Sequence, residues 1–360
     1  MISPTKKVKK FFESGATYPY SSAYGEKAEE YINLSSNESP YGPSPSIKRL
    51  IKKEITKLSL YPDPACTELK REISKFLEVS PDCLVIGNGS DEIMDLVCKA
   101  FLEEGEKVFI PLPSFAIYEM VSRLYGGCLR FYKLPKFEWR NDIASKARGC
   151  KLAFVGRPNN PTGNLPPKSL VEKISKMVGI LVIDEAYIEF SDEESLAKWA
   201  SEQSNVLVLR TFSKAFGLAG LRIGYGVGNP KLVQLLDAIR LPFNINRIAQ
   251  AAAIAALRDK KYFERVVRII KSEREKMAKE LKSLGLRPLP SQANFLMVDV
   301  KPWNVNAEDF CKMLMRKKIL VRSLVNFRGA GENFVRITIG SPEQNRELIA
   351  ALKELGRNLS

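Results

Sequence analysis

Residues 180–187 have the sequence Ile180-Leu181-Val182-Ile183-Asp184-Glu185-Ala186-Tyr187, in which four apolar residues are followed directly by two carboxylates. An unbroken apolar run, without alternation, is typical of a strand that is buried on both faces of a sheet. Similar short runs occur at residues 84–86, 107–110, 151–155, 206–209 and 221–227. Because amphipathic segments separate several of these runs, we predict the α/β class, with a mostly parallel sheet flanked by helices.

The rest of the chain predicts a second, smaller domain of the α+β type. Helical patterns dominate residues 230–284. After that, short apolar runs alternate with further helical segments, at residues 295–298, 319–322 and 334–339. We therefore expect three parts: an N-terminal arm at residues 1–45 that packs on the small domain, a large domain at 46–270, and a small C-terminal domain at 271–360.

The composition excludes several kinds of chemistry. The 360 residues contain no histidine, which rules out Ser-His-Asp triads, Cys-His pairs and histidine-ligated metal centres. The six cysteines are widely spaced, Cys83 and Cys98 being the closest pair, so we expect no zinc site and no other metal. An enzyme with this composition has to work through lysine, tyrosine, carboxylates, serine, cysteine or a cofactor.

The chain is basic, with 56 Lys and Arg against 41 Asp and Glu and a net charge of +15. Such a charge suits nucleic acid, an anionic membrane or small acidic ligands. However, the charges alternate in sign over residues 264–282, and the one dense basic run is the short segment at residues 6–10. We expect neither nucleic acid nor a membrane as partner, although a non-catalytic nucleic-acid-binding protein is an alternative that a clustered basic face would support. Without a signal-peptide core or a long apolar stretch, the sequence predicts a cytoplasmic protein.

Polar motifs follow the predicted strand ends, which is where open α/β sheets bind their ligands. Residues 87–92 (GNGSDE) combine glycines with helix-capping side chains, a pattern that suits a phosphate but also fits any capped helix. Residues 157–163 (RPNNPTG) predict a rigid turn that aims Asn160 in one direction. A purely structural turn would explain the prolines and the glycine but not the two adjacent asparagines.

Two more strand ends carry charged side chains. Asp184 would be costly to bury without a cation, so its partner is either a basic side chain of the protein or a cationic ligand, and this motif leaves both open. Lys214 lies in residues 211–222 (TFSKAFGLAGLR), between hydroxyls on one side and apolar or small residues on the other. A semi-buried lysine loses proton affinity and becomes a candidate Schiff-base nucleophile. The two hydroxyls before it, together with Arg222, could bind a dianion.

Taken in order, these motifs resemble a known family. The segments at 160–163 (NPTG), 184–187 (DEAY) and 213–222 (SKAFGLAGLR) resemble the fold-type-I pyridoxal-phosphate-dependent aminotransferases. Within that family, the histidinol-phosphate aminotransferases are the subgroup with the most similar segments, at residues 34–45, 61–64, 87–92, 210–222 and 335–340. The resemblance extends from about Tyr20 to the C-terminus and implies a large domain that binds pyridoxal 5'-phosphate.

The resemblance implies three catalytic residues. Lys214 would bind the cofactor as a Schiff base, and Asp184 would pair with the protonated pyridine nitrogen of the ring. Asn160 and Tyr187 would hydrogen-bond the phenolic oxygen, and Tyr187 completes the catalytic set. Phe115 would stack on the ring, where the subgroup more often has tyrosine.

The remaining cofactor contacts involve the phosphate group. The matching positions that would hold it are Gly89, Ser90, Asp91, Thr211, Ser213 and Arg222. In addition, Tyr61 would reach the phosphate in the neighbouring subunit, which implies a homodimer with shared sites.

For the substrate, the resemblance implies contacts from Tyr20, Asn37, Arg322 and Arg336. Arg336 would bind a carboxylate or the equivalent polar end, whereas Tyr20 and Arg322 would bind a phosphate. The implied reaction transfers an amino group between L-histidinol phosphate and 2-oxoglutarate, with glutamate as the other partner, in histidine biosynthesis. The alternatives are threonine-phosphate decarboxylase of cobalamin synthesis, whose pattern favours phenylalanine at the position of Tyr187, and an aromatic amino-acid aminotransferase.

Overall fold

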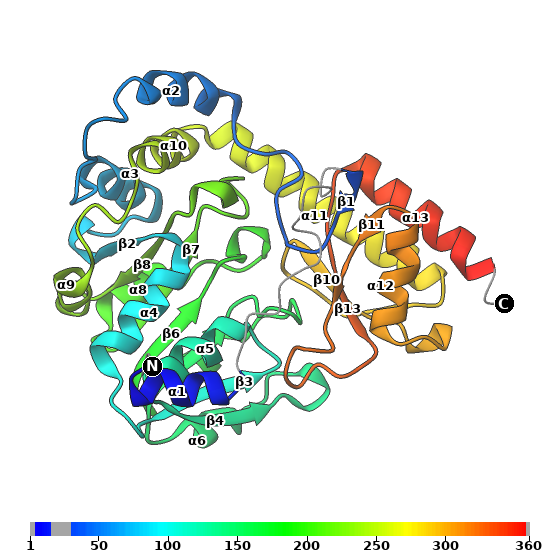
Figure 1. Ribbon diagram of the computed structural model, residues 1–360, viewed down its shortest axis with the longest axis horizontal. Coiled ribbons are helices and arrows are strands. Elements are labelled where there is room, and N and C mark those ends of the chain that lie inside the picture. Colours follow the sequence, from blue (N-terminus) through cyan, green and yellow to red (C-terminus); the bar gives the residue numbers. More distant parts are fainter. Residues whose placement is uncertain (1–3, 16–29, 358–360) are drawn as a thin grey trace.

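The computed structural model describes residues 4–15 and 30–357 (Figure 1). One part of the molecule is a large sheet with helices on both faces, and a smaller part, drawn in orange and red, contains the C-terminal strands and helices. The helix α11 (Lys260–Ser283) extends from the first part into the second.

The large sheet has seven strands in the order β2-β8-β7-β6-β5-β3-β4. Their bounds are β2 (Leu84–Gly87), β3 (Lys107–Leu112), β4 (Cys128–Lys133), β5 (Cys150–Gly156), β6 (Val178–Asp184), β7 (Val206–Thr211) and β8 (Gly224–Gly228). Neighbouring strands are parallel except that β8 is antiparallel to both β2 and β7. The predicted α/β class and mostly parallel sheet are therefore confirmed.

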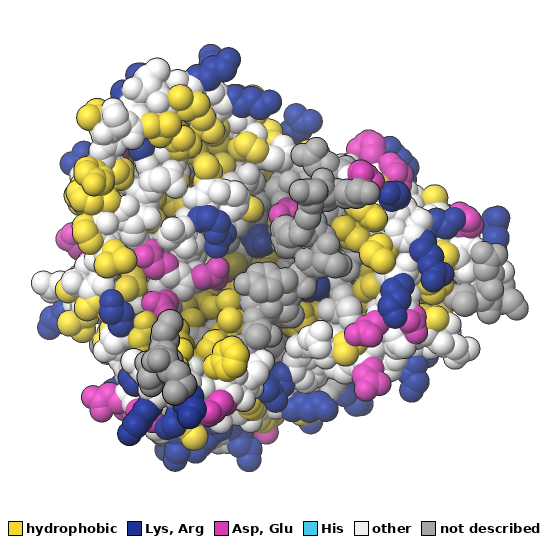
Figure 2. Space-filling view, in the orientation of Figure 1, with side chains coloured by type: hydrophobic (Ala, Val, Ile, Leu, Met, Phe, Trp, Pro, Cys, Tyr) yellow, Lys and Arg dark blue, Asp and Glu magenta, His cyan; other side chains and the backbone are white. Residues whose placement is uncertain are grey.

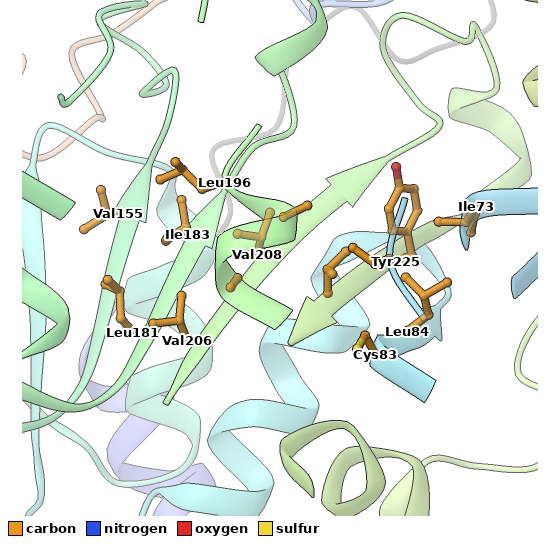
Figure 3. Close-up of a cluster of buried hydrophobic side chains, with 14 of the residues drawn as sticks. Ile73, Cys83, Leu84, Val155, Leu181, Ile183, Leu196, Val206, Val208 and Tyr225 are labelled. Carbon is orange, nitrogen blue, oxygen red and sulfur yellow. The ribbon is translucent and has the colours of Figure 1, made fainter. Parts of the chain in front are cut away.

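Both faces of this sheet are covered, as the unbroken apolar runs predicted. Along β6, Leu181 and Ile183 belong to one core, whereas Val182 belongs to the core on the opposite face. Figure 3 shows the first of these cores, where Val206 and Val208 of β7 lie beside the two β6 residues. Since successive strand side chains point to opposite faces, four apolar residues in a row are buried here because a helical layer covers each face.

The helices divide between the two faces. The core that contains Val182 also contains side chains of α4 (Gly89–Phe101), α5 (Ala116–Leu124) and α9 (Pro230–Ile239). The helices that contribute to the core on the other face are α2 (Pro45–Ile55), α3 (Thr67–Leu77), α6 (Ile143–Ala147), α7 (Lys168–Ser175), α8 (Ala197–Glu202) and α10 (Arg247–Arg258).

The C-terminal part has a separate core, to which α11 contributes Val266, Ile270 and Met277. Its four-stranded sheet has the order β12-β13-β10-β9. The elements are β9 (Arg287–Pro288), β10 (Phe295–Asp299), α12 (Ala307–Arg316), β11 (Ile319–Leu320), β12 (Arg322–Ser323), β13 (Phe334–Thr338) and α13 (Pro342–Arg357).

Two predicted strands differ in detail from the observed ones. The run at 221–227 becomes a strand only at Gly224, because Ala219–Leu221 form a short 3-10 helix and Arg222 is left-handed, with φ of 51°. The run at 319–322 divides into β11, which pairs with β1 (Ile32–Asn33), and β12, which pairs with β13.

The N-terminal arm contacts both parts of the molecule. Whereas β1 pairs with β11 in the C-terminal part, the helix α1 (Lys6–Glu13) lies against α5 of the large part, and Lys10 forms a salt bridge with Glu104. The boundary expected at residue 270 falls inside α11. The three-part division of the chain stays a prediction.

On the face that Figure 2 shows, the surface charge is spread over both parts of the molecule. Figure 2 shows Lys and Arg side chains over both parts of the visible face, with Asp and Glu side chains among them. Of the helices in the described ranges, none is long and apolar enough to cross a membrane.

Candidate active site

A cavity of about 620 Å³ lies where the two parts of the molecule meet. The ends of β6 and β7 provide Asp184 and Thr211, and β12 and β13 provide Arg322 and Arg336 from the C-terminal part. Since parallel strands end at the same edge of a sheet, residues far apart in the sequence converge here. The predicted residues that line the cavity are Asn37, Gly89, Ser90, Asp91, Phe115, Asn160, Asp184, Tyr187, Thr211, Ser213, Lys214, Arg222, Arg322 and Arg336.

Asp184 ends β6 and is almost fully buried. Its carboxylate accepts hydrogen bonds from the Tyr118 hydroxyl (2.7 Å) and from the Ala186 backbone N–H (3.1 Å). Burial outweighs these hydrogen bonds and raises the pKa of Asp184 to about 6. Within the described part of the chain, no basic side chain forms an ion pair with this carboxylate. Of the two partners that the sequence left open, a cationic ligand is the one that fits.

Lys214 lies three residues beyond the end of β7, and its ammonium group donates to the Ser36 carbonyl at 3.2 Å. Burial is the main cause that lowers the pKa of Lys214 to about 8, and the nearby Arg336 adds to the effect. A substantial fraction of this amine is therefore neutral slightly above neutral pH, which a nucleophile or a general base requires.

The start of α4 faces Arg222 across a short gap. A Cβ atom added at Gly89 would lie 2.7 Å from Arg222 Nη2, so glycine is what allows the guanidinium to approach the backbone. Arg222 Nη2 also lies 3.1 Å from a carboxylate oxygen of Asp91. A helix N-terminus beside an arginine and two buried hydroxyls, those of Thr211 and Ser213, is suited to a phosphate group.

The two adjacent asparagines of the 157–163 turn have different roles. Asn159 holds the turn itself, because its amide donates to the Pro113 carbonyl (2.9 Å) and to the Thr162 hydroxyl (2.8 Å). Asn160 instead lines the cavity, and its amide donates to the Tyr187 hydroxyl at 3.4 Å. The pair therefore combines a structural residue with a site residue.

Two arginines lie on the wall that the C-terminal part provides. Arg322 and Arg336 are directly opposite each other in the β12–β13 pairing, and both are buried. Like charges at opposite positions of neighbouring strands destabilise a sheet unless an anion or other acceptors compensate them. Arg336 donates to the Asn160 side chain and to the Ser35 carbonyl, each at 2.7 Å. This arrangement suits an anionic substrate.

Of the predicted residues that the structure describes, Tyr61 is not among those that line the cavity. It is 78% exposed and stacks on Phe243 with ring centroids 4.5 Å apart. Its predicted role requires a second subunit and stays a prediction. Tyr20 lies outside the described residues.

Several residues of the site were not predicted from the sequence. Tyr118 holds the Asp184 carboxylate, and the Ser36 carbonyl holds the Lys214 ammonium group. Ile117, Met120 and Phe327 form much of the apolar lining. The only sequence signal for Tyr118 was its place one turn into a helix that follows a strand end, and many aromatic residues share it.

Comparison with known proteins places this site in a family. The profile described as "Aminotransferase class I and II" matches residues 29–352. The chain therefore belongs to the class I and II aminotransferase family. It is also 38% identical to the histidinol-phosphate aminotransferase of Methanocaldococcus jannaschii over 97% of this chain and 96% of that protein.

Solved structures agree with this assignment. The crystal structure of the histidinol-phosphate aminotransferase from Clostridium acetobutylicum has a TM-score of 0.84 and 31% identity, covering 91% of this chain and 99% of that one. The enzyme from Sinorhizobium meliloti, solved in complex with pyridoxal-5'-phosphate, has a TM-score of 0.87 and 27% identity over 99% of this chain and all of that one. The predicted resemblance and the predicted fold type are thus confirmed.

Proposed function

We propose that this chain is a pyridoxal-phosphate-dependent histidinol-phosphate aminotransferase, which transfers an amino group between L-histidinol phosphate and 2-oxoglutarate. The observation that carries the proposal is the single cavity that brings Lys214 and Asp184 together with the buried arginines Arg322 and Arg336. Lys214 and Asp184 suit the cofactor. The arginines suit substrates that are phosphorylated or have two carboxylates.

The residues that line the cavity fit both ends of pyridoxal phosphate, its ring nitrogen and its phosphate group. Asp184 is a buried carboxylate with a raised pKa and no basic partner among the described residues, so a protonated ring nitrogen would compensate its charge. At the other end, Gly89 and Ser90 at the start of α4 line the cavity together with Arg222, so the helix N-terminus and the guanidinium would hold a phosphate. Phe115 lines the same cavity and would cover one face of the ring.

The protein side chains then have distinct tasks. Pyridoxal phosphate, when bound, supplies an electron sink for the negative charge that develops at the amine-bearing carbon of the substrate. Lys214 Nζ, in its neutral form, accepts the proton from that carbon, and its lowered pKa makes the neutral form accessible. Asp184 stays ionised above about pH 6 and holds a positive charge at its end of the cavity. Arg322 and Arg336 bind the anionic ends of the substrates.

The proposal includes a homodimer in the cytoplasm, in which Tyr61 of the partner subunit completes the phosphate site. What supports the dimer is a group of exposed apolar side chains around Tyr61. Its members are Leu58, Leu60, Tyr61, Leu241 and Phe243.

The test is a substrate comparison with purified protein supplied with pyridoxal phosphate. Transamination should be much faster with L-histidinol phosphate than with phenylalanine, and it should depend on 2-oxoglutarate. A visible absorbance band should disappear when the protein is treated with borohydride, and the cofactor should then be attached covalently to Lys214. The Lys214→Ala variant is the control, because it keeps the cavity and loses the amine.

Two outcomes would contradict the proposal. Release of carbon dioxide from threonine phosphate as the main activity would favour the decarboxylase. Equal or faster turnover of phenylalanine would favour an aromatic aminotransferase.

A further inference from the structure

Tyr118 of α5 supports the Asp184 carboxylate from behind the cavity. Asp184 lines the cavity, whereas Tyr118 is not among the lining residues and donates its hydroxyl hydrogen to the carboxylate at 2.7 Å. We propose that Tyr118 is a positioning residue, whose hydroxyl keeps Asp184 ionised and oriented before the cofactor binds and so extends cofactor binding to lower pH. This inference rests on the proposed function, because the cation that Asp184 would bind is the ring nitrogen of pyridoxal phosphate.

The ring of Tyr118 is held in place by other aromatic rings. It is 1% exposed and stacks on Phe154 of β5, with ring centroids 5.1 Å apart and an angle of 8° between the planes. Phe115 meets it edge to face, with centroids 5.7 Å apart. A buried ring that is packed in this way has little freedom to move, so the position of its hydroxyl is set before any ligand binds.

The direction of the hydrogen bond follows from the chemistry of the two groups. An ionised carboxylate can only accept, so the Tyr118 hydroxyl is the donor. Burial is the main cause that raises the pKa of Tyr118 well above its ordinary value of 10, and the nearby Asp184 adds to the effect. The phenol therefore keeps its hydrogen near neutral pH and remains a donor.

Each oxygen of the Asp184 carboxylate has a donor from the protein. Tyr118 donates to Oδ2, and the Ala186 backbone N–H donates to Oδ1 at 3.1 Å. Two contacts on different oxygens fix the plane of the carboxylate. Because a carboxylate oxygen can accept more than one hydrogen bond, Asp184 can still accept a donor from the cavity without losing either contact.

The same hydrogen bond stabilises the charge of Asp184. Burial disfavours the ionised form and raises the pKa of Asp184, and the Tyr118 hydroxyl is the group that opposes burial most strongly. Two charged neighbours act in opposite directions, since Asp91 of α4 disfavours the charge and Lys214 favours it. The Tyr187 hydroxyl is also ionisable and lies near Tyr118. A change confined to the Tyr118 hydroxyl leaves all of these groups in the protein.

Loss of the Tyr118 hydroxyl should therefore affect cofactor binding in a pH-dependent way. In Tyr118→Phe the ring keeps its packing, but charged Asp184 loses a donor, so the pKa of Asp184, about 6 in the wild type, should rise by about one unit. A protonated Asp184 has to release its proton before it can pair with a protonated ring nitrogen, so affinity falls as pH falls through this pKa. At higher pH, Asp184 is ionised in both proteins. The variant then lacks the hydrogen bond with and without cofactor, and the two affinities should agree.

The experiment titrates the cofactor-free wild type and Tyr118→Phe with pyridoxal phosphate and follows the visible absorbance band. We expect the variant to bind about fivefold more weakly at about pH 6 and equally well at about pH 8, as a shift of one pH unit in the pKa requires. Tyr125→Phe is the matched control, because it removes another hydroxyl, at the end of α5 and outside the cavity lining, that donates to a carboxylate, Asp95, at 3.2 Å. It should match the wild type at both pH values. Urea unfolding verifies that each variant is folded under these conditions.

The outcomes separate this inference from the proposed function. If Tyr118→Phe binds the cofactor like the wild type at about pH 6, or is weakened by the same factor at both pH values, the hydroxyl does not control the charge of Asp184. The inference is then wrong while the proposed function stands, and an equal effect of Tyr125→Phe has the same meaning. A wild-type protein that shows no visible band with pyridoxal phosphate overturns the proposed function and this inference with it.

A second variant covers the case in which Tyr118→Phe does not fold. Replacement of Tyr118 by a ring-fluorinated tyrosine keeps the hydroxyl and makes it a stronger donor, so it should lower the pKa of Asp184. Cofactor binding at about pH 6 should then be tighter than in the wild type and unchanged at about pH 8. Binding that does not tighten at the lower pH would contradict the inference.

Discussion

Replacement of Asp184 by asparagine should make the cofactor-free protein more stable at neutral pH while it weakens cofactor binding. In the folded chain this carboxylate is buried, and burial raises its pKa from the ordinary value of 3.8 to about 6. The unfolded chain exposes the group to water. Ionised Asp184 therefore favours unfolding, and asparagine removes that charge without changing the size of the side chain.

The magnitude follows from the two pKa values. A pKa raised from 3.8 to about 6 corresponds to about 3 kcal/mol above pH 6, since each pH unit is worth about 1.4 kcal/mol. Asparagine also disturbs the contacts of Asp184 with Tyr118 and with the Ala186 N–H, because only one of its two ends can accept a hydrogen bond. That loss costs about 1 kcal/mol. The net gain at pH above 6 is about 2 kcal/mol.

The sign of the pH dependence distinguishes this explanation from a general packing effect. Between the unfolded and folded pKa values, the folded chain binds more protons than the unfolded chain, so the wild-type protein loses stability as pH rises through this range. Urea unfolding of cofactor-free protein at about pH 4.5 and about pH 7.5 measures the difference. Asp184→Asn should be about as stable as the wild type at the lower pH and about 2 kcal/mol more stable at the higher one.

Asp82→Asn is the matched control, because Asp82 is exposed and lies outside the cavity lining. It should change stability little at either pH. An equal effect of Asp184→Asn at both pH values, or a destabilised variant at the higher pH, would refute the argument from burial. The same samples, titrated with pyridoxal phosphate, should show much weaker binding by the variant.

Three further variants test other parts of the site. Lys214→Met should abolish turnover. Because burial lowers the pKa of Lys214 to about 8, the variant should also stabilise the cofactor-free protein below that pH. The gain in stability should fade as pH rises toward the ordinary pKa of 10.5, as measured by urea unfolding. Arg157→Met leaves Glu185 as a buried charge without its partner and should cost about 3–5 kcal/mol in urea unfolding, whereas Arg328→Met, at a partly exposed ion pair, should cost less than about 1 kcal/mol. Arg322→Gln should raise the KM for L-histidinol phosphate at least about tenfold and the KM for glutamate less, as measured by steady-state kinetics.

The positions of the motifs were predictable because they depend on local rules. Four apolar residues before Asp184 indicate a strand buried on both faces, and the carboxyl ends of parallel strands form one edge of the sheet. That rule predicts Asp184, Asn160 and Lys214 at one edge of the sheet, and all three line the cavity there. The family resemblance then added the roles, which strand patterns alone could not supply.

The supporting contacts could not be predicted, since each one joins side chains of elements that are far apart in the sequence. Tyr118 contacts Asp184 across 66 residues of sequence, and Thr338 contacts Asn37 across 301. Nothing in the local pattern of a helix or a strand specifies such a partner. The division of residues 319–322 between two sheets has the same origin, because the pairing of β1 with β11 involves the N-terminal arm.

The charges of the cavity indicate why it is suited to hold a cofactor. Asp184 and Lys214 have opposite charges and line the same cavity, but among the residues that the structure describes neither is the ion-pair partner of the other. Had the fold brought them into contact, each would have neutralised the other and both would have been ordinary structural residues. Because they stay apart, burial keeps the pKa of one raised and of the other lowered, and both effects disfavour the charged forms near neutral pH. A ligand with a cationic nitrogen at one end can pair with Asp184, and a carbonyl carbon at its other end can react with Lys214. The same buried groups that make the cofactor-free protein less stable therefore contribute affinity for such a ligand.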